Sequence, residues 1–231
     1  MGESILITGA NRGLGLELTR YFAYLGWRVH ACCRDPEAAV ELDQIARSAD
    51  VVRVHRLDLT AYEQMLALRD ELSGAPLDVL FHNAGTYGQD GAAFGRTDPQ
   101  RWLEAFQINA IGPLKLTEAL VDNVADSGRK LVAAMSSKMG SIADNRSGDS
   151  YVYRSSKAAL NSVMASAALD LRARGICVVL LHPGWVLTDM GGPNAELTVE
   201  ESVRRLHRIV DRATLADTGA FFDIDGSRIP W

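Results

Sequence analysis

Short, mostly apolar runs recur along the chain, and longer segments with helical spacing separate them. The apolar runs predict six buried strands, because their side chains do not alternate between apolar and polar. We expect these strands at 4–8, 28–33, 51–57, 78–83, 131–135 and 176–181. Between the first two runs, Leu14, Leu18, Phe22 and Leu25 form one helical stripe. Alternating strands and helices predict an α/β fold in which helices cover both faces of a parallel sheet.

Glycine or polar residues follow each predicted strand directly. Because the carboxyl ends of parallel strands meet at one edge of the sheet, and ligands bind there, these residues predict one ligand site. The positions are the turn that begins at Gly9, then Arg34, Asp58, Asn83, Ser137 and Pro183-Gly184.

The turn after the first strand reads GANRGLG over residues 9–15 and leads into a helix. Glycines permit a tight turn and let the backbone approach a pyrophosphate, which the helix N-terminus then binds. The spacing differs from the more familiar G-x-G-x-x-G, but the position between a strand and a helix predicts a dinucleotide site.

The end of the second strand lacks the acidic residue that usually binds the ribose 2′-hydroxyl of NAD. Cys33 and Arg34 stand there instead. Together with Arg12, Arg34 favours binding of a 2′-phosphate, so we expect NADP(H). Asp35 and Pro36 have the pattern of an N-cap and a first helical residue, which predicts that a helix starts there.

Two further strand ends offer groups to a cofactor. Asp58 either accepts a hydrogen bond from an adenine amino group or caps the next helix, and the sequence leaves both open. Asn83, Ala84 and Gly85 are small enough to let the backbone approach a cofactor. Residues 86–98 are expected to form a surface loop.

Tyr153 and Lys157 are four residues apart in a segment that favours a helix, so they share one helix face. A phenol has a pKa of about 10, and a neighbouring ammonium group lowers it. A decrease of about three units requires roughly 4 kcal/mol, more than Lys157 alone is expected to supply. The same spacing is also common on surface helices, so the rest of the chain has to support the functional interpretation. Asn109 lies within another predicted helix, which is apolar, so its amide needs hydrogen-bond partners. It is either a functional residue or a polar core group whose hydrogen bonds are satisfied.

Composition limits the alternatives. The chain has 231 residues, 47% of them apolar, and a net charge of −5 without a basic run. We expect one domain over residues 1–231, no nucleic-acid partner and no membrane segment. The N-terminal segment lacks the features of a signal peptide, and the three cysteines favour a reducing compartment, so we expect a cytoplasmic protein without a metal site.

Taken together, these motifs resemble the classical short-chain dehydrogenase/reductase family. Residues 8–15 resemble its TGxxxGxG motif, and residues 82–85 resemble NNAG with the first position changed. Pro183-Gly184 resembles its PG motif. The resemblance covers nearly the whole chain and implies a single Rossmann-type, doubly wound parallel sheet of about seven strands. It also implies a homodimer or homotetramer.

The resemblance assigns roles to individual residues. Asn109, Ser137, Tyr153 and Lys157 match the catalytic tetrad: Tyr153 donates the proton and Ser137 binds the carbonyl oxygen. Lys157 lowers the pKa of Tyr153 and binds ribose, and Asn109 holds a water that connects Lys157 to solvent. The implied NADP(H) site consists of Gly9, Asn11, Arg12, Gly13, Leu14, Gly15, Arg34, Asp58, Leu59, Asn83, Ala84, Gly85, Tyr153, Lys157, Pro183, Gly184, Val186 and Thr188.

Residues 136–142, 151–154 and 182–185 and the ending 225–231 resemble the sniffer and C-factor group of carbonyl reductases. This group implies NADPH, a cytosolic location and reduction of a carbonyl. A small aldehyde, ketone or quinone is the expected substrate class, in an open pocket that Met139, Trp185 and Met190 can line. For Met139, an ordinary core position is an equally good interpretation.

Three alternatives remain at this point. The first is a non-catalytic NADP-binding sensor or signalling protein, which the intact tetrad disfavours. The second is an alcohol dehydrogenase that uses the same residues in the oxidative direction. The third is an interaction module in which Leu160, Val163 and Met164 pair with a second copy; it is compatible with the enzyme, because the family usually assembles through these helices.

Overall fold

The computed structural model describes residues 2–90 and 93–231. In this part of the chain, seven parallel strands form one sheet in the order β3-β2-β1-β4-β5-β6-β7. The strands are β1 (Ser4–Thr8), β2 (Arg28–Cys33), β3 (Val52–Arg56), β4 (Val79–His82), β5 (Leu131–Met135), β6 (Cys177–Leu181) and β7 (Ala220–Phe222). The strand order reverses between β1 and β4, which is the point where such sheets bind ligands.

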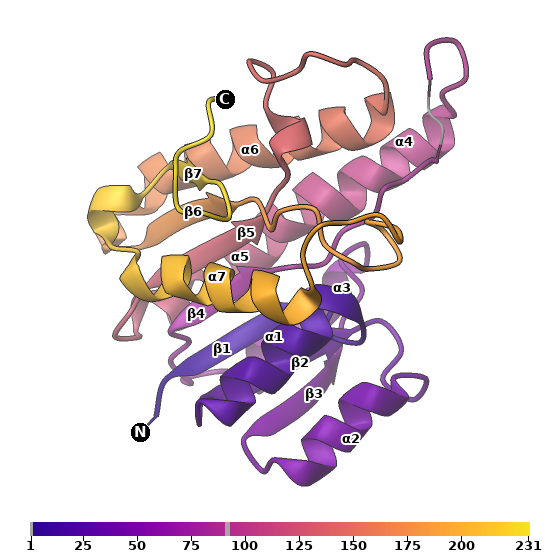
Figure 1. Ribbon diagram of the computed structural model, residues 1–231. Coiled ribbons are helices and arrows are strands. Elements are labelled where there is room, and N and C mark those ends of the chain that lie inside the picture. The colour runs from indigo at the N-terminus through magenta and orange to yellow at the C-terminus, as the bar shows by residue number, and fades with distance from the viewer. Residues whose placement is uncertain (1, 91–92) are drawn as a thin grey trace.

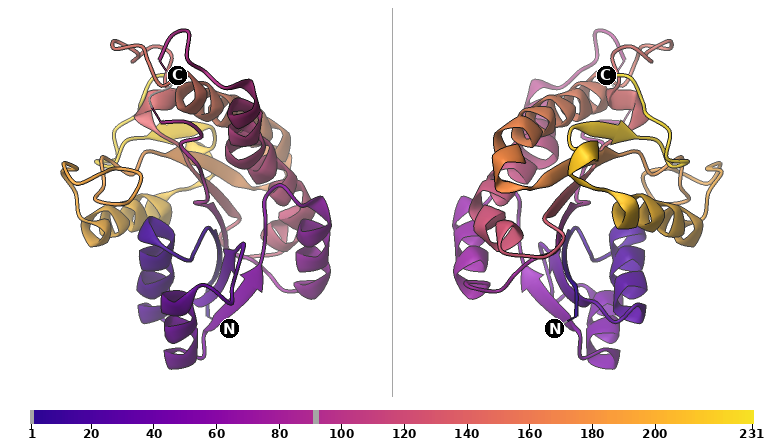
Figure 2. Two further views of the ribbon diagram at one scale, coloured as in Figure 1. Left: turned by 90° about the vertical axis from the view of Figure 1, so that its right-hand side faces the viewer. Right: turned by 90° about the vertical axis from the view of Figure 1, so that its left-hand side faces the viewer.

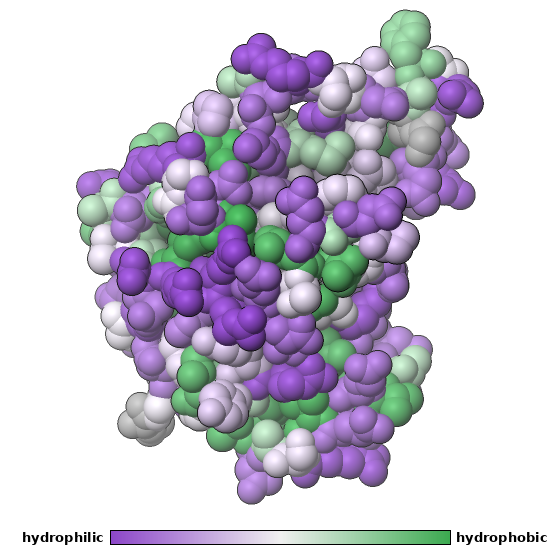
Figure 3. All heavy atoms as spheres, viewed as in Figure 1, coloured by the Kyte–Doolittle hydropathy of each residue, from purple (hydrophilic) through white to green (hydrophobic). Residues whose placement is uncertain are grey.

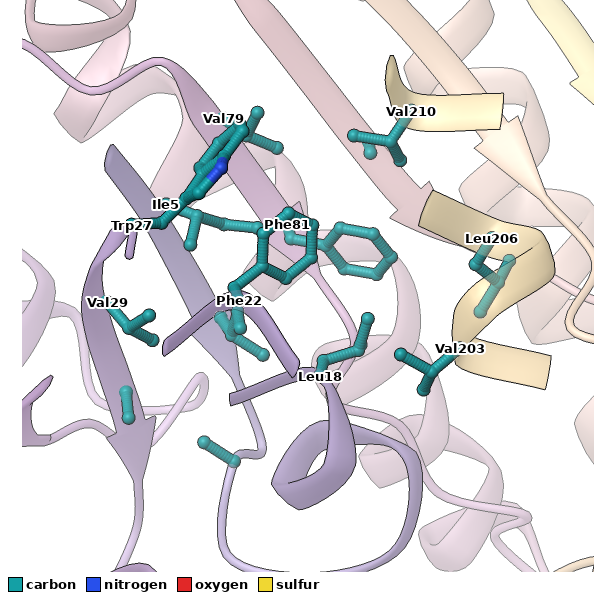
Figure 4. Packing of buried hydrophobic residues seen from close by; sticks show 14 of the residues in the cluster. Ile5, Leu18, Phe22, Trp27, Val29, Val79, Phe81, Val203, Leu206 and Val210 are labelled. Carbon is teal, nitrogen blue, oxygen red and sulfur yellow. The ribbon is translucent and has the colours of Figure 1, made fainter. Parts of the chain in front are cut away.

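One face of the sheet packs against α1 (Gly13–Tyr24), α2 (Val40–Ser48) and α7 (Val199–Arg212). Leu18 and Phe22 of α1 meet Val203 and Leu206 of α7 over the strands, and all four are fully buried (Figure 4). The views in Figure 2 show these helices on one side of the sheet and the remaining long helices on the other.

The opposite face packs against α3 (Tyr62–Glu71), α5 (Gly112–Ala125) and α6 (Tyr151–Leu171), with α4 (Pro99–Phe106) leading into α5 (Figure 1). A π-helical turn, η1 (Gln107–Ile111), joins α4 to α5 and contains Asn109. Pi turns of this kind are frequent at functional sites. The predicted fold class, an α/β parallel sheet with helices on both faces, is therefore confirmed.

One local prediction is wrong, and one of the two roles left open for Asp58 is excluded. The helix expected at Asp35-Pro36 begins only at Val40, because Pro36 starts a turn in which its carbonyl accepts the amide hydrogen of Ala39. Asp58 does not cap α3, whose N-cap is Ala61. The Asp58 carboxylate instead accepts hydrogen bonds from the backbone amide and the hydroxyl of Thr60.

The predicted pairing surface on α6 also needs correction. Leu160 and Met164 are 1% and 0% exposed, and Val163 packs against the same core, so these side chains belong to the interior of this chain. The stripe on α1 is right for Leu18 and Phe22, but Leu25 follows the helix and is exposed.

Hydrophilic residues cover much of the face formed by α7, and a hydrophobic tip marks the loop before α4 (Figure 3). In that loop, the Phe94 side chain is 88% exposed. Within residues 2–90 and 93–231, none of the helices combines the length and apolar character needed to cross a bilayer.

Candidate active site

A cavity of about 640 Å³ opens at the carboxyl ends of β5 and β6. Ser137, which follows β5, and Tyr153, in the first turn of α6, lie in its wall. Met139, Trp185 and Met190 also line it, so the three residues expected to form an apolar pocket do meet there. The cavity therefore brings two polar groups of the predicted tetrad together with several apolar side chains.

The turn between β1 and α1 is held closely against the end of β4. The amide of Asn83 donates hydrogen bonds to the carbonyl oxygens of Thr8 and Gly9 at 2.9 and 3.2 Å. A Cβ on Gly15 would lie 2.1 Å from the Gly9 oxygen, and Gly9 adopts a φ of +67° beside Ala84. Glycine is required at both places, so the turn has the close packing that the sequence motif predicts.

The amino end of α1 is suited to a phosphate group. Its N-cap residue, Arg12, is extended and makes no side-chain cap, which leaves the first backbone amides of the helix to an anionic ligand. Thr188 lies beside this turn, because a Cβ on Gly13 would be 3.5 Å from the Thr188 methyl group. Leu14 and Thr188 both line the cavity, which connects this turn to Tyr153.

The two arginines expected to bind a 2′-phosphate differ in their contacts. Arg12 forms an exposed ion pair with Asp189 at 3.0 Å. Arg34 is exposed after β2, and no acidic side chain pairs with it among residues 2–90 and 93–231. Its backbone is held in place, since Arg56 donates to the Arg34 carbonyl at 3.0 Å and also pairs with Glu37.

The turn that carries Ser137 is anchored to α6. Asn161 accepts a hydrogen bond from the Ser136 hydroxyl at 2.5 Å and donates one to the Gly140 carbonyl at 3.2 Å. The Ser137 hydroxyl accepts the amide hydrogen of Met139 at 3.2 Å, at the start of the short helix η2 (Lys138–Gly140). These contacts fix the serine and the tyrosine relative to one another, because Asn161 and Tyr153 belong to the same helix.

Burial controls the ionisation of the tyrosine and the lysine. Loss of solvent raises the pKa of Tyr153 to about 12, although the neighbouring Ser137 hydroxyl acts in the opposite direction. The expected lowering of this pKa by Lys157 is therefore not found in the protein alone. Burial lowers the pKa of Lys157 to about 8, and its ammonium lies 5.8 Å from the centre of the Tyr153 ring.

Asn109 and Lys157 lie behind the cavity rather than in its wall. Lys157 donates to the Met135 carbonyl at 2.8 Å. Asn109 binds both backbone groups of Thr86, each at 2.8 Å, and donates to Ser156 at 2.9 Å. Gly85 lies between the two side chains, since a Cβ there would be 3.3 Å from the Asn109 oxygen and 3.3 Å from the Lys157 nitrogen.

Only some of the remaining predicted residues line the cavity. Pro183, Gly184 and Val186 line the cavity after β6, whereas Asp58 and Leu59 follow β3 and do not line it. The described structure thus brings Ser137, Tyr153, Leu14, Thr188 and the segment 183–186 to one cavity.

Several residues in and around the site were not predicted from the sequence. Tyr87 lines the cavity and stacks on Tyr153, and Lys138 and Arg154 also line it. Asn161 holds the turn that carries Ser137. Of these, an aromatic residue two positions after the Asn83-Ala84-Gly85 segment was the one signal available for Tyr87.

Comparisons with known proteins show which family this chain resembles. The family model for short chain dehydrogenase matches residues 3–197. The C-signal protein of Myxococcus xanthus is 44% identical over 167 residues, which cover 72% of this chain and all of that protein. Carbonyl reductase Sniffer of D. melanogaster superposes with a TM-score of 0.93 at 33% identity and covers both chains completely.

A third relative is a structure with a bound cofactor. A putative short-chain dehydrogenase/reductase from Burkholderia multivorans with bound NADP has a TM-score of 0.90 at 36% identity, with both chains fully covered. A family match over most of the chain, together with solved structures that match its whole length, shows that this chain belongs to the short chain dehydrogenase family.

Proposed function

We propose that this protein is an NADPH-dependent oxidoreductase that reduces an aldehyde, ketone or quinone to the alcohol. The observation that carries the proposal is the position of the Tyr153 phenol and the Ser137 hydroxyl in the wall of one cavity, beside the glycine turn. The NADP-bound relative and the carbonyl reductase Sniffer support both the cofactor and the substrate class.

NADPH, when bound, supplies a hydride from its nicotinamide ring. The chain provides the amino end of α1 for the pyrophosphate and Arg34, with Arg12, for the 2′-phosphate. Thr188 lies next to the Gly13 turn and is assigned to the cofactor site. Lys157 and Asn109 lie on either side of Gly85, at the strand end where the nicotinamide ribose is expected.

Tyr153 is the proton donor in this proposal. Its pKa of about 12 keeps the phenol protonated at neutral pH, but efficient proton donation requires a lower pKa in the reacting complex. Ser137 donates a hydrogen bond to the carbonyl oxygen and stabilises the negative charge that develops there. Lys157, whose pKa is about 8, is mostly charged at pH 7 and favours transfer of the phenolic proton.

The test is NADPH oxidation measured with a panel of aldehydes, ketones and quinones. We expect turnover by the native chain and a loss of at least about 100-fold in Tyr153→Phe, as for removal of a general acid. The variant should bind NADPH with an unchanged Kd. Equal turnover by Tyr153→Phe would contradict the role of the phenol.

Cofactor selectivity is tested separately. Arg34→Ala should raise the Kd for NADPH by roughly 10-fold or more, because a hydrogen bond to a charged group contributes about 1.5–3 kcal/mol. The Kd for NADH should not change, since NADH lacks the 2′-phosphate. Tighter binding of NADH than of NADPH by the native chain would exclude this assignment.

A second candidate is an NADP-binding signalling protein, which the 44% identity to C-signal favours. Tight NADPH binding without turnover of any carbonyl in the panel would support this candidate over the reductase.

Self-association is proposed for either function, in keeping with the family. It would use exposed residues such as Ile111 and Leu169, which are 48% and 77% exposed. A light-scattering mass of one chain would exclude it.

A further inference from the structure

The ring of Tyr87 lies against the ring of Tyr153 at the cavity wall. The two ring centroids are 4.6 Å apart and the ring planes differ by 17°. Tyr87 comes from the segment between β4 and α4 and is half-buried, whereas Tyr153 is buried in α6. Protein therefore covers one face of the Tyr153 ring and limits the orientations that this ring can adopt.

Tyr87 is also bonded to the start of the helix that carries Tyr153. Its hydroxyl lies 2.8 Å from the hydroxyl of Ser150, the N-cap residue of α6. A serine in this position usually caps the helix with its own side chain, but Ser150 makes no such bond. Ser150 and Asp149 have φ values of +50° and +60°, a left-handed conformation that is unusual for residues other than glycine. The Tyr87 hydroxyl thus supports a strained helix start three residues before Tyr153.

The backbone around Tyr87 is fixed on both sides. Asn109 binds the backbone amide and carbonyl of Thr86. Gly88 has a φ of +79° and lies so close to α6 that a Cβ there would be 2.6 Å from Val152. Because its neighbours are held, the backbone of Tyr87 cannot shift away from α6 without breaking these contacts. The same Asn109 therefore supports the segment that carries the stacking ring.

We propose that Tyr87 is a positioning residue for Tyr153: it holds the phenol in the plane from which the proton is delivered and excludes water from one ring face. The effect of Tyr87 on catalysis rests on the proposed reductase function, but the contact between Tyr87 and Tyr153 does not. Both the missing water and the electron-rich face of the neighbouring ring disfavour a tyrosinate. Removal of the ring should therefore make Tyr153 easier to ionise while it disorders the phenol.

Other groups near Tyr153 stay constant in the test. Lys157 faces the ring from the next turn of α6, and Ser137 approaches from the end of β5. The charged and titratable side chains of the cavity wall are Asp90, Lys138, Asp144, Arg154, His182 and Asp189.

The experiment compares the native chain with Tyr87→Ala and with Tyr87→Phe, which keeps the ring and loses only the hydroxyl. Tyrosinate absorbance is titrated with pH for each chain and for its Tyr153→Phe counterpart. Because the protein has six tyrosines, the difference between the two curves isolates Tyr153. We expect Tyr87→Ala to lower the pKa of Tyr153 and Tyr87→Phe to restore most of the native value.

Kinetics provide the second measurement. Stacking of two aromatic rings contributes about 0.5–1.5 kcal/mol, so Tyr87→Ala should lower kcat by up to roughly 10-fold, with the KM for NADPH unchanged. Tyr87→Phe should lose no more than about 3-fold. Should Tyr87→Ala fail to fold, judged by circular dichroism, Tyr87→Leu replaces it with the same expectations.

Identical Tyr153 titration in the native, Ala and Phe chains would overturn the proposal, whether or not the protein reduces carbonyls. A native chain without turnover would refute the reductase function alone, because the titration needs no substrate. A decrease in kcat that Tyr87→Phe does not reverse would also overturn the positioning role of the ring.

Discussion

The buried ammonium of Lys157 should make this protein less stable than it would be without it. The side chain is 3% exposed, and the pKa falls from 10.5 to about 8 because burial disfavours the charged form. At pH 7, which is below both pKa values, this difference corresponds to about 3 kcal/mol against folding. The informative substitution is Lys157→Met, which keeps the approximate length of the side chain and removes the charge.

The substitution also removes a favourable contact. Lys157 donates to the Met135 carbonyl at 2.8 Å, and an unpaired buried acceptor costs about 1–3 kcal/mol. The two effects leave Lys157→Met about 1 kcal/mol more stable than the native chain at pH 7. Activity should nevertheless be lost, because the ammonium assists proton transfer from Tyr153 in the proposed reaction. Stability and activity are thus expected to change in opposite directions.

The dependence on pH separates the charge effect from packing. The folded-state pKa lies below the unfolded value, so the unfolded chain binds more protons between about pH 8 and pH 10.5 and native stability gains from rising pH. The advantage of Lys157→Met over the native chain should therefore shrink by about 1 kcal/mol between pH 7 and pH 9. The cysteine thiols of the unfolded chain also titrate in this range, but they are common to both chains and cancel in the difference.

The assay is urea unfolding followed by tryptophan fluorescence, at pH 7 and pH 9 and one protein concentration. Lys157→Gln serves as a control that removes the charge and retains a hydrogen-bond donor. The reasoning would be refuted if the stability difference between the two chains did not change with pH. It would also be refuted if Lys157→Met were less stable than the native chain by more than about 2 kcal/mol at pH 7.

Two further outcomes follow from packing and burial. Gly15→Ala should lower the free energy of unfolding by about 1–3 kcal/mol and weaken NADPH binding, because a Cβ would lie 2.1 Å from the Gly9 oxygen. Gly128→Ala, where the nearest atom is 3.6 Å away, is the matched control in urea unfolding and should cost much less. His30 has its pKa lowered to about 4, first by burial and then by the charge of His55, 3.0 Å away, so native stability is lost as pH falls below 6.5. Native stability should fall by about 2 kcal/mol relative to His30→Phe between pH 6.5 and pH 4.5 in urea unfolding, and parallel stability curves would contradict this.

The strands, and the edge of the sheet where they end, could be predicted from the sequence because buried parallel strands leave nearly continuous apolar runs. The three residues of β7, Ala220–Phe222, are too few to stand out, and the number of strands came from the family resemblance. The polar residues after the strands were found for the same reason, since the topology of a parallel sheet brings them to one edge. The family membership then follows from the motif order.

Features that depend on tertiary packing could not be predicted from the sequence pattern. Helical periodicity places Leu160 and Met164 on one face, but it does not reveal that the sheet of the same chain covers that face. Spacing puts Lys157 one turn from Tyr153, but the effect of burial on both pKa values depends on the folded environment. The stack on Tyr87 is likewise a contact between segments that are distant in the sequence.

The π turn η1 changes the phase of a long helix. A π turn holds one more residue than an α turn, so the residues on either side are offset by one position, about 100° around the axis. Before the turn, Ala105 packs against Val152 of α6; after it, Leu116 and Leu120 face the sheet. Asn109 sits at this change of phase, where its side chain can reach both Thr86 and Ser156. The site therefore depends on the number of residues in this helix as well as on their identity, and a chain one residue shorter here would have to give up one of the two packing faces.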